Sequence, residues 1–260
     1  MSLLLVKISA GMLVGTLVGL TGMGGGAALL PILIFVLGVP PIVAVGSAAA
    51  FNALTKIGAG FIHWRHRSVD WRLVSLLALG SVPGSFCGVM VLAHLRYLYG
   101  NGVNDFLRTV IGVLLICIPL LYVAQRFLAK GLSHLSQPQR LPYVAISLIG
   151  LAGGFLVGMT SVGSGSIFML FLMMFVRGSP AILVGTNIVH AIVLTGFTSL
   201  LHLRLGTVDS TLVFPLLGGS LPGSVLGAQL CQRLPSHWIR GTLYIVLFVT
   251  GVGVLLGILK

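Results

Sequence analysis

The feature that most constrains this sequence is the near absence of charge along most of its length. No Lys, Arg, Asp or Glu lies between Lys7 and Lys56, for example. Several apolar runs exceed the roughly 18–20 residues that a helix needs to cross the hydrocarbon core of a bilayer. Only 7% of the residues are charged and the mean hydropathy is +1.13, whereas soluble domains have about a quarter charged residues. We therefore expect an all-α polytopic membrane protein.

The charged residues that are present are strongly biased towards the positive sign. Fifteen Lys and Arg residues stand against three acidic residues, which gives a formal net charge of +12. The basic residues are spread over short loops and form no basic helix or aromatic–basic alternation, so we expect no nucleic-acid partner. Two compatible interpretations remain. A cytoplasmic excess of Lys and Arg orients the helices in the lipid bilayer, and a positive field attracts an anion.

The sequence repeats itself at an offset of 139 residues without gaps, as between Pro41 and Pro180. Unrelated apolar segments would not keep one register over helices, motifs and loops. We therefore expect a first repeat over 1–128, a polar, proline-containing linker over 129–142, and a second repeat over 143–260. Three pairs of motifs carry the match: "GLTGMGGG" (19–26) with "GMTSVGSG" (158–165), "HWRHRSVD" (63–70) with "HLRLGTVD" (202–209), and "GSVPGSFCG" (80–88) with "GSLPGSVLG" (219–227).

Each repeat divides in the same way, into a short apolar piece, a glycine-rich stretch, a second short piece and three full spans. The two short pieces and their break total about 30 residues, or about 45 Å as one straight helix. That is too long for one crossing and too short for two. We therefore predict a broken, re-entrant helix pair in each repeat, with each limb reaching near the midplane. The expected pieces are 8–21, 27–37, 41–62, 72–95 and 106–128, then 142–158, 166–176, 181–202, 211–233 and 239–259.

Three crossings after a re-entrant pair would invert the second repeat in the membrane. Inverted repeats are common in secondary transporters, where broken helices of the two halves meet at the substrate site. The charge bias does not decide between inverted and parallel repeats. With the loop at 63–72 in the cytoplasm, both arrangements put the same number of basic residues inside. The prediction of inverted repeats therefore depends on the length of the broken pair alone.

The glycine-rich breaks are candidate binding sites for an anion. A helix that begins inside the membrane presents free N–H groups and the positive end of its dipole, and glycine places no side chain in front of them. The alternative is close helix packing, which we favour for glycines such as Gly11 and Gly15. In the second repeat the hydroxyl of Ser166 adds a further donor. The predicted anion contacts at the breaks are Gly24, Gly25 and Gly26, and Gly163, Ser164 and Gly165.

Polar residues inside the span that follows each break complete the predicted site. Asn52 and Lys56 lie four residues apart, as do Thr186 and His190, so each pair shares a helix face. Ionisable residues inside a span usually face the protein interior. For Lys56 the alternative is an amine that reaches the membrane surface, and for His190 a hydrogen-bonded structural role. The predicted substrate contacts in these spans are Ser47, Asn52 and Lys56, and Thr186, Asn187 and His190.

The residues at the helix ends have structural interpretations. We expect His63 and His202, at matching positions, either to hold the geometry of the loops that follow them or to contact lipid headgroups. Asp70 and Asp209 are expected to cap the next helices. With Asp105 they are the acidic residues of the chain, and all three fall at loop edges. No carboxylate is therefore expected inside a span to bind a cation or relay protons, which favours an anion.

Other classes of function lack their motifs. A G-x-G-x-x-A pattern at 22–27 mimics a dinucleotide fingerprint, but no strand precedes it and no acidic residue follows about twenty positions later. No GxxxxGK[ST] motif is present, so transport must use gradients, and we expect no cofactor and no metal. An intramembrane enzyme would need a nucleophile such as Ser164 with His190. The first repeat has Gly25 in place of Ser164, so we do not expect an enzyme.

The sequence resembles the sulfite exporter TauE/SafE family of bacterial membrane permeases over nearly its whole length. The matching features are "GLTGMGGGAALLPIL" at 19–33, the span "GSAAAFN…K" at 46–56 and the loop "HWRHRSVDW" at 63–71, with their echoes in the second repeat. The chain departs from the glycine-rich pattern at Ser164 and Ser166. The resemblance implies a multi-pass protein of the bacterial cytoplasmic (inner) membrane that moves sulfur-containing anions such as sulfite, sulfoacetate or thiosulfate.

The resulting hypothesis is a secondary transporter. It would export small sulfur-containing anions, such as sulfite, thiosulfate or organosulfonates, by alternating access, with the substrate held between the paired glycine breaks near the midplane. A passive anion channel of the same architecture is the alternative. A homodimer is compatible with either hypothesis.

Overall fold

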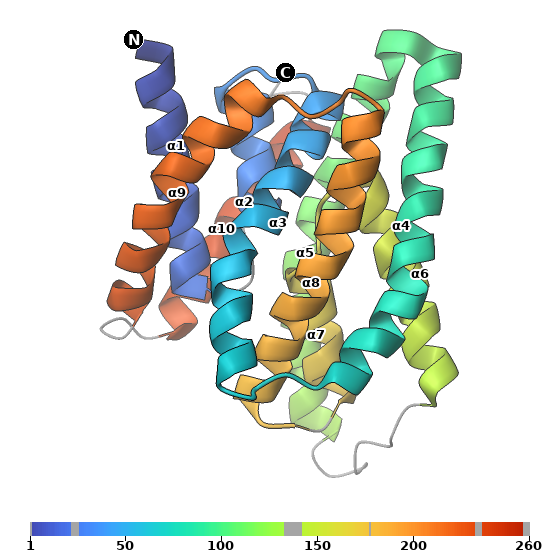
Figure 1. Cartoon of the computed structure of the whole chain (residues 1–260), viewed down its shortest axis with the longest axis vertical. Coiled ribbons are helices and arrows are strands. Elements are labelled where there is room, and N and C mark those ends of the chain that lie inside the picture. Colours follow the sequence, from blue (N-terminus) through green and yellow to red (C-terminus); the bar gives the residue numbers. More distant parts are fainter. Residues whose placement is uncertain (1, 22–25, 133–141, 177, 232–235, 257–260) are drawn as a thin grey trace.

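The computed structural model describes residues 2–21, 26–132, 142–176, 178–231 and 236–256. These residues form a bundle of helices without a strand (Figure 1), and most boundaries lie within a few residues of those predicted. The helices are α1 (Ser2–Thr21), α2 (Gly26–Pro31) with a π-helical turn η1 (Ile32–Val36), α3 (Pro41–Arg65), α4 (Trp71–Tyr99), a 3-10 turn η2 (Gly100–Gly102), α5 (Val103–Leu132), α6 (Tyr143–Thr160), α7 (Ser166–Phe175), α8 (Pro180–Arg204), α9 (Ser210–Cys231) and α10 (Ser236–Leu255).

Among the described residues, five helical stretches are long and apolar enough to cross a membrane. Large apolar side chains also cover the outside of the bundle, where Leu79, Val144 and Leu200 are more than half exposed. An exterior of this kind suits contact with lipid tails. The chain is a multi-pass membrane protein, as predicted. The five stretches are Pro41–Arg65, Trp71–Ala124 (which joins α4 and α5), Tyr143–Thr160, Ala181–Arg204 and Ser210–Gly227.

The second repeat contains the helix break that the sequence predicts. α6 ends at Thr160, after which Ser161 adopts a left-handed conformation with φ 58° and Gly163 has φ +94°. Left-handed residues end a right-handed helix, and glycine adopts such angles easily because it has no Cβ. α7 then begins at Ser166. The predicted break of the first repeat, at 22–25 between α1 and α2, lies outside the described residues.

The two limbs of each broken pair differ in length. α1 has 20 residues and α6 has 18, whereas α2 has 6 and continues into the 5 residues of η1, and α7 has 10. At a rise of 1.5 Å per residue, α6 is about 27 Å long, and it is one of the stretches long enough to cross a membrane. α6 thus agrees in length with the predicted piece at 142–158 and is long enough on its own to cross most of a membrane.

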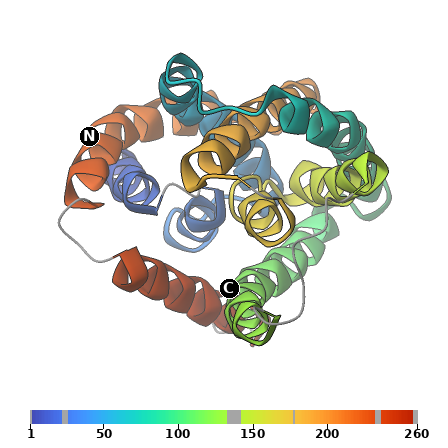
Figure 2. The same cartoon turned by 90° about the horizontal axis from the view of Figure 1, so that it is seen from below.

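Four pairs of helices pack side by side: α1 with α9, α4 with α6, α3 with α8, and α5 with α10 (Figures 1 and 2). Glycines bring two of these pairs close together. A methyl group at Gly11 would overlap the backbone of Leu216, one at Gly15 would overlap Ser220, and similar overlaps occur along α6. Small residues let membrane helices approach closely, so the packing interpretation of Gly11 and Gly15 is confirmed.

Contacts between the repeats come in exchanged pairs. Gly11 of α1 lies against Leu216 of α9. The equivalents of these two residues at the offset of 139, Gly150 of α6 and Leu77 of α4, lie against each other in the same way. Each repeat therefore places its first helix against the fourth helix of the other repeat.

The central helices α3 and α8 run antiparallel to each other. Gly46, near the start of α3, lies against Thr207, just beyond the end of α8. Gly185, near the start of α8, lies against Ser68, just beyond the end of α3. Equivalent helices of the two repeats thus point in opposite directions at the centre of the bundle (Figure 1).

Two clusters of buried apolar side chains position the break. The first contains Phe51 of α3 and Leu107 of α5, and it extends to Val162 in the break itself. The second contains Leu77 of α4 and Phe168 of α7. The break at 161–165 therefore lies where the two clusters meet, fully inside the protein.

Candidate functional site

The break between α6 and α7 is buried along its whole length. Ser161 is fully buried and Ser164 is 2% exposed. The N–H of Ile167 donates to the carbonyl of Gly163, and the N–H of Met169 donates to the carbonyl of Gly165, so helical bonding resumes directly after the break. Backbone that leaves helical geometry at membrane depth is tolerated where protein buries it or where it lines a polar cavity. The N–H groups that open α7 lie at the positive end of its dipole.

Lys56 of α3 reaches this break from the other repeat. Its Nζ donates a hydrogen bond to Ser164 Oγ at 3.2 Å, and the side chain is only 5% exposed. The alternative interpretation, in which the amine reaches the membrane surface, is wrong because Ser164 holds the amine inside the bundle. Of the Lys and Arg side chains that the structure describes, that of Lys56 is buried and the others are half-buried or exposed. The acidic residues Asp70, Asp105 and Asp209 are half-buried or exposed near helix starts.

α8 contacts the break from its own repeat. The Nδ2 amide of Asn187 donates to the carbonyl of Gly165 at 2.9 Å. One turn further, the Nε2 atom of His190 is hydrogen-bonded to Ser81 Oγ of α4 at 2.8 Å. The ring of His190 meets the ring of Phe168 edge to face, with centroids 4.5 Å apart. The structure thus brings Lys56 of the first repeat close to Ser164, Gly165, Asn187 and His190 of the second.

Several buried polar atoms of the break, α3 and α8 have no hydrogen-bond partner among the described protein groups. They are both amide atoms of Asn52, the Oδ1 of Asn187, the Nδ1 of His190 and the hydroxyl of Ser161. All four side chains are at most 2% exposed. A buried polar group without a partner is costly, and a native protein rarely leaves one unmatched. Together with the ammonium group of Lys56, these atoms can donate to, and in part accept from, a small polar ligand.

Two predicted site residues, Ser47 and Thr186, form hydrogen bonds to loops and not to the break. Ser47 Oγ accepts from the N–H of Asp209 at 3.0 Å, and Thr186 Oγ1 accepts from the N–H of Asp70 at 2.9 Å. Each hydroxyl therefore ties its helix to a loop of the other repeat, and the two bonds are equivalent at the offset of 139 residues. We call these two hydrogen bonds the loop clamps. They lie at opposite ends of the α3–α8 pair and not at the break.

The predicted glycine contacts are described in part. Gly24 and Gly25 lie outside the described residues, and Gly26 is the first residue of α2. In the second repeat, Gly163 supplies the positive φ that turns the chain, and Gly165 presents its carbonyl to Asn187. The described residues therefore include one of the two predicted breaks, the one in the second repeat.

The structural interpretations of the helix ends are confirmed. His63 Nδ1 is hydrogen-bonded to Ser68 Oγ at 2.8 Å, and His202 Nδ1 to Thr207 Oγ1 at 2.9 Å. These bonds fix the turns that follow α3 and α8. Asp70 accepts from the backbone N–H groups of Arg72 and Leu73, and Asp209 accepts from Thr211 in the same way. Both carboxylates are thus N-caps, as predicted.

Ser81 and Ser161 are residues of the site that the sequence reasoning missed. Ser81 belongs to the duplicated "GSVPGS" motif, which identified the repeat but was given no role. Its glycines let α4 approach α6, and its serines face α8, since Ser85 is also hydrogen-bonded to Thr198 at 2.7 Å. Serines four residues apart inside an apolar span were the signal for a polar seam between helices.

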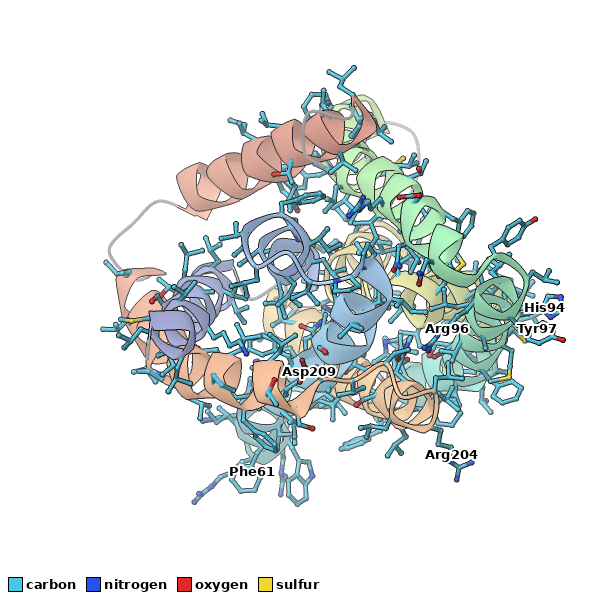
Figure 3. The ribbon with its side chains drawn as sticks, turned by 90° about the horizontal axis from the view of Figure 1, so that it is seen from above. Phe61, His94, Arg96, Tyr97, Arg204 and Asp209 are labelled. Carbon is cyan, nitrogen blue, oxygen red and sulfur yellow. The ribbon has the colours of Figure 1, made fainter. Side chains whose placement is uncertain are left out.

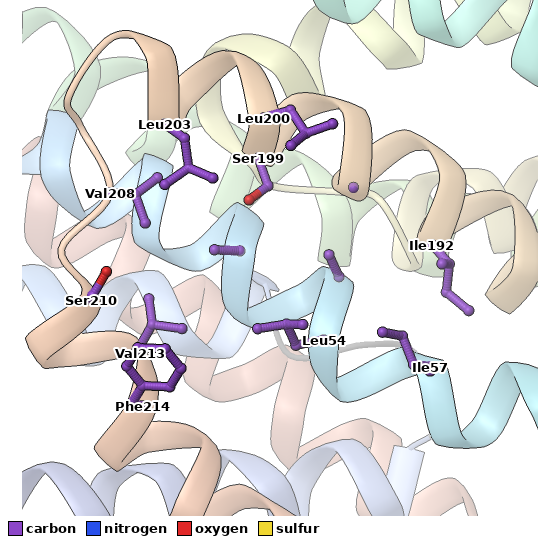
Figure 4. Close-up of a pocket in the computed structure, with 13 residues that line it drawn as sticks. Leu54, Ile57, Ile192, Ser199, Leu200, Leu203, Val208, Ser210, Val213 and Phe214 are labelled. Atoms are coloured by element: carbon purple, nitrogen blue, oxygen red, sulfur yellow. The ribbon is translucent and has the colours of Figure 1, made fainter.

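A separate apolar pocket lies on the outer side of α3, α8 and α9 (Figure 4). Its volume is about 440 Å³, and its walls include Leu54, Ile57, Leu200 and Phe214. None of the predicted site residues lines it, so it is not the candidate site. No group of three or more His, Cys, Asp or Glu that could hold a metal ion occurs in the described part of the chain.

Comparison with known proteins gives a consistent result. The sequence profile named "Sulfite exporter TauE/SafE" matches residues 8–254. The chain is 34% identical over 251 residues to the probable membrane transporter protein YjnA of Bacillus subtilis, covering 94% of this chain and 96% of that protein. It is 26% identical over 268 residues to the probable membrane transporter protein MJ0441 of Methanocaldococcus jannaschii, covering 98% and 96%. No solved structure gives a significant match.

Proposed function

Because the chain belongs to the sulfite exporter TauE/SafE family, and is thus a membrane transporter, we propose that it is a secondary transporter that exports small sulfur-containing anions. Sulfite, thiosulfate and organosulfonates are the candidate substrates. The exporter would lie in the cytoplasmic membrane and bind its substrate at the break between α6 and α7. The relatives reported above carry names that state membrane transport and no substrate.

The observation that carries this proposal is the buried ammonium group of Lys56. It is bonded to Ser164 at the break, and no carboxylate of the chain is buried beside it. A buried charge is costly unless an opposite charge and hydrogen bonds accompany it. A bound anion would supply both. The site therefore favours an anion over a cation or a neutral substrate.

The neutral groups around Lys56 support an oxyanion in particular. The Nδ2 of Asn52 and the hydroxyl of Ser161 are buried donors without a partner among the residues that the structure describes. The N–H groups at the start of α7 add a helix N-terminus, where oxyanions bind readily. Sulfite, thiosulfate and sulfonates each present several oxygen acceptors around a small centre, which matches several donors from different helices.

Alternating access is supported by the relation between the repeats. The exchanged contacts and the antiparallel α3 and α8 favour two copies that are inverted in the membrane, the symmetry of many secondary transporters. The loop clamps, Ser47–Asp209 and Thr186–Asp70, lie at opposite ends of this central pair. In an alternating-access cycle, one clamp would open while the other stays closed, and the anion would be released to one side at a time.

The test is anion flux into proteoliposomes that contain the purified protein. Hydrogen bonds to charged groups contribute about 1.5–3 kcal/mol, so Lys56→Ala is expected to lower sulfite flux at low substrate concentration by about 10- to 100-fold. Arg204→Ala is the matched control, because Arg204 is an exposed cation at the end of α8 and points away from the bundle (Figure 3). Equal flux in both variants would remove Lys56 from the mechanism.

The same vesicles separate a carrier from a channel. A carrier saturates with substrate and accelerates exchange when substrate is present on the far side. Large unitary currents, with no exchange, would instead support the passive anion channel.

A further inference from the structure

We infer that the site at the α6–α7 break selects anions by valence and prefers monovalent anions to divalent ones. The inference rests on the proposed function, because it concerns the anion that the same site would transport. It follows from the number of charges that the fold buries around the break.

Among the side chains that the structure describes, one contributes a full positive charge to the site. That charge is the ammonium group of Lys56, which is 5% exposed and bonded to Ser164. The remaining Lys and Arg side chains that the structure describes are half-buried or exposed. Asp70 and Asp209 are engaged as N-caps, and Asp105 pairs with Arg108 at the start of α5. No acidic side chain therefore offsets Lys56, and no second described cation of this kind reinforces it.

The histidines do not add a second charge. His190 is fully buried, lies against the ring of Phe168 and is within electrostatic reach of Lys56. A second cation in that position would lose its hydration and be repelled by the ammonium group. His202 is also fully buried, and its two ring nitrogens are bonded to Thr207 and to the carbonyl of Gly158. We therefore count both rings as neutral.

The helix dipoles contribute little net charge. The start of α7 carries about half a positive elementary charge, and the end of α6 carries about half a negative one. Both termini lie at the same break, between Thr160 and Ser166. Their partial charges offset each other to a first approximation, which leaves Lys56 as the dominant charge.

The charge count gives a preference between substrates. A monovalent anion beside Lys56 makes the buried site neutral overall. A divalent anion leaves one negative charge in a region of low polarity, where an uncompensated charge is strongly disfavoured. The amide of Asn52 and the hydroxyl of Ser161 bind oxygen atoms of either anion, so they do not reverse this preference.

Sulfonates provide the cleanest test, because their charges do not change near neutral pH. The purified full-length protein is titrated with methanesulfonate (one charge) and methanedisulfonate (two charges) at constant ionic strength, and the shift of the melting temperature is measured. A ligand that binds the folded protein raises its stability. Methanesulfonate is expected to bind at least about tenfold more tightly, a difference of about 1.4 kcal/mol. Propanesulfonate, a larger monovalent anion, controls for size, and dimethyl sulfone controls for charge.

Variants of Lys56 test whether its charge holds the anion. Lys56→Gln is expected to weaken the binding of methanesulfonate at least about tenfold, because the bound anion then lacks its counter-charge. Lys56→Arg is expected to keep the affinity and the preference, and Arg204→Gln, at an exposed position, to leave both at the wild-type values. The wild-type titrations decide the inference even if Lys56→Gln does not fold. Tighter or equal binding of methanedisulfonate by the wild type overturns it, and so does binding of methanesulfonate to Lys56→Gln with the wild-type affinity.

The outcomes also separate this inference from the proposed function. Binding of both anions with equal affinity, lost in Lys56→Gln, would overturn the valence preference and leave the anion transporter intact. Binding of neither anion, together with no sulfite flux in proteoliposomes, would overturn both.

Discussion

The central helices α3 and α8 occupy equivalent positions in the two repeats, yet they carry different polar side chains. At the offset of 139 residues, Lys56 of α3 corresponds to Thr195 of α8, and His190 of α8 corresponds to Phe51 of α3. By contrast, the glycine contacts, histidine turns, aspartate caps and loop clamps occur twice, once for each repeat. The duplicated part of the sequence therefore builds the scaffold, and the part that differs builds the site.

This difference has a physical reason. Two copies of a scaffold stabilise each other through self-complementary contacts, so duplication preserves them. A second buried ammonium near the first would be repelled by it and would lack a counter-charge. One site made from Lys56 of the first repeat and Asn187 of the second avoids that repulsion.

The largest effect is expected when Lys56 is replaced by the residue that the second repeat has at the equivalent position. Lys56→Thr gives α3 the residue that α8 has at the equivalent position, and it should lower sulfite flux by about 10- to 100-fold, because the charge at Ser164 is lost. The double variant Lys56→Thr with Thr195→Lys moves the cation to the other repeat. Proteoliposome flux at the wild-type rate in that double variant would show that the two repeats are interchangeable, contrary to the comparison above.

Equivalent changes of the helix-packing glycines should lower the stability equally in the two repeats. Gly15→Ala and Gly154→Ala each force a methyl group into the backbone of a serine on the facing helix. We expect each change to lower the free energy of unfolding by about 1–3 kcal/mol, and thermal denaturation in detergent measures it. Gly58→Ala is the matched control, since nothing lies within 4 Å of that position. Markedly different losses at Gly15 and Gly154 would contradict an equivalent scaffold.

Equivalent serine-to-alanine changes in α4 and α9 should have unequal effects on stability and on sulfite binding. Ser81→Ala leaves the Nε2 atom of His190 without its partner, which costs about 1–2 kcal/mol of stability and weakens sulfite binding. The equivalent change, Ser220→Ala, is expected to have almost no effect, because the hydroxyl of Ser220 has no described partner. Thermal denaturation with and without sulfite measures both. Similar losses in the two variants would place the same chemistry in both repeats.

The smallest effects are expected at the loop clamps. Ser47→Ala and Thr186→Ala each remove one hydrogen bond to a backbone N–H, which contributes about 1 kcal/mol. Their effects on stability should be equal, but their effects on transport should differ in direction. Measured separately from the two sides of the membrane, substrate access should increase on one side for Ser47→Ala and on the other for Thr186→Ala. An increase on the same side for both variants would contradict the proposal that the two loop clamps control opposite sides of the membrane.

Much of the fold follows from local features of the sequence. Apolar runs between turn residues predict the helices, and Asp70 and Asp209 predict two helix starts, because a cap needs only a side chain and the next turn of backbone. The offset between Pro41 and Pro180 predicts a second copy of the same order of helices. The length of α1 was less predictable, since an apolar sequence does not record where a helix starts.

The site was predictable in its residue types and not in its contacts. The spacing paired Thr186 with His190 on one helix face, whereas the neighbouring Asn187 is the residue that contacts the break. The sequence left open whether the amine of Lys56 reaches the membrane surface or the interior. Its position depends on the hydrogen bond to Ser164, which is 108 residues away in the chain. Ser47 and Thr186 were assigned to the site on polarity alone, and the structure uses them on loops of the other repeat.

By itself, the sequence determined that the chain is a duplicated, all-helical membrane protein with few acidic groups. Composition, periodicity and repetition can be read from the linear order of the residues, without knowledge of how the helices pack. Only the tertiary structure decided that one buried lysine meets the break of the opposite repeat. Hydrogen bonds across more than a hundred residues depend on how helices pack against one another, and the order of residues within each helix does not contain that information.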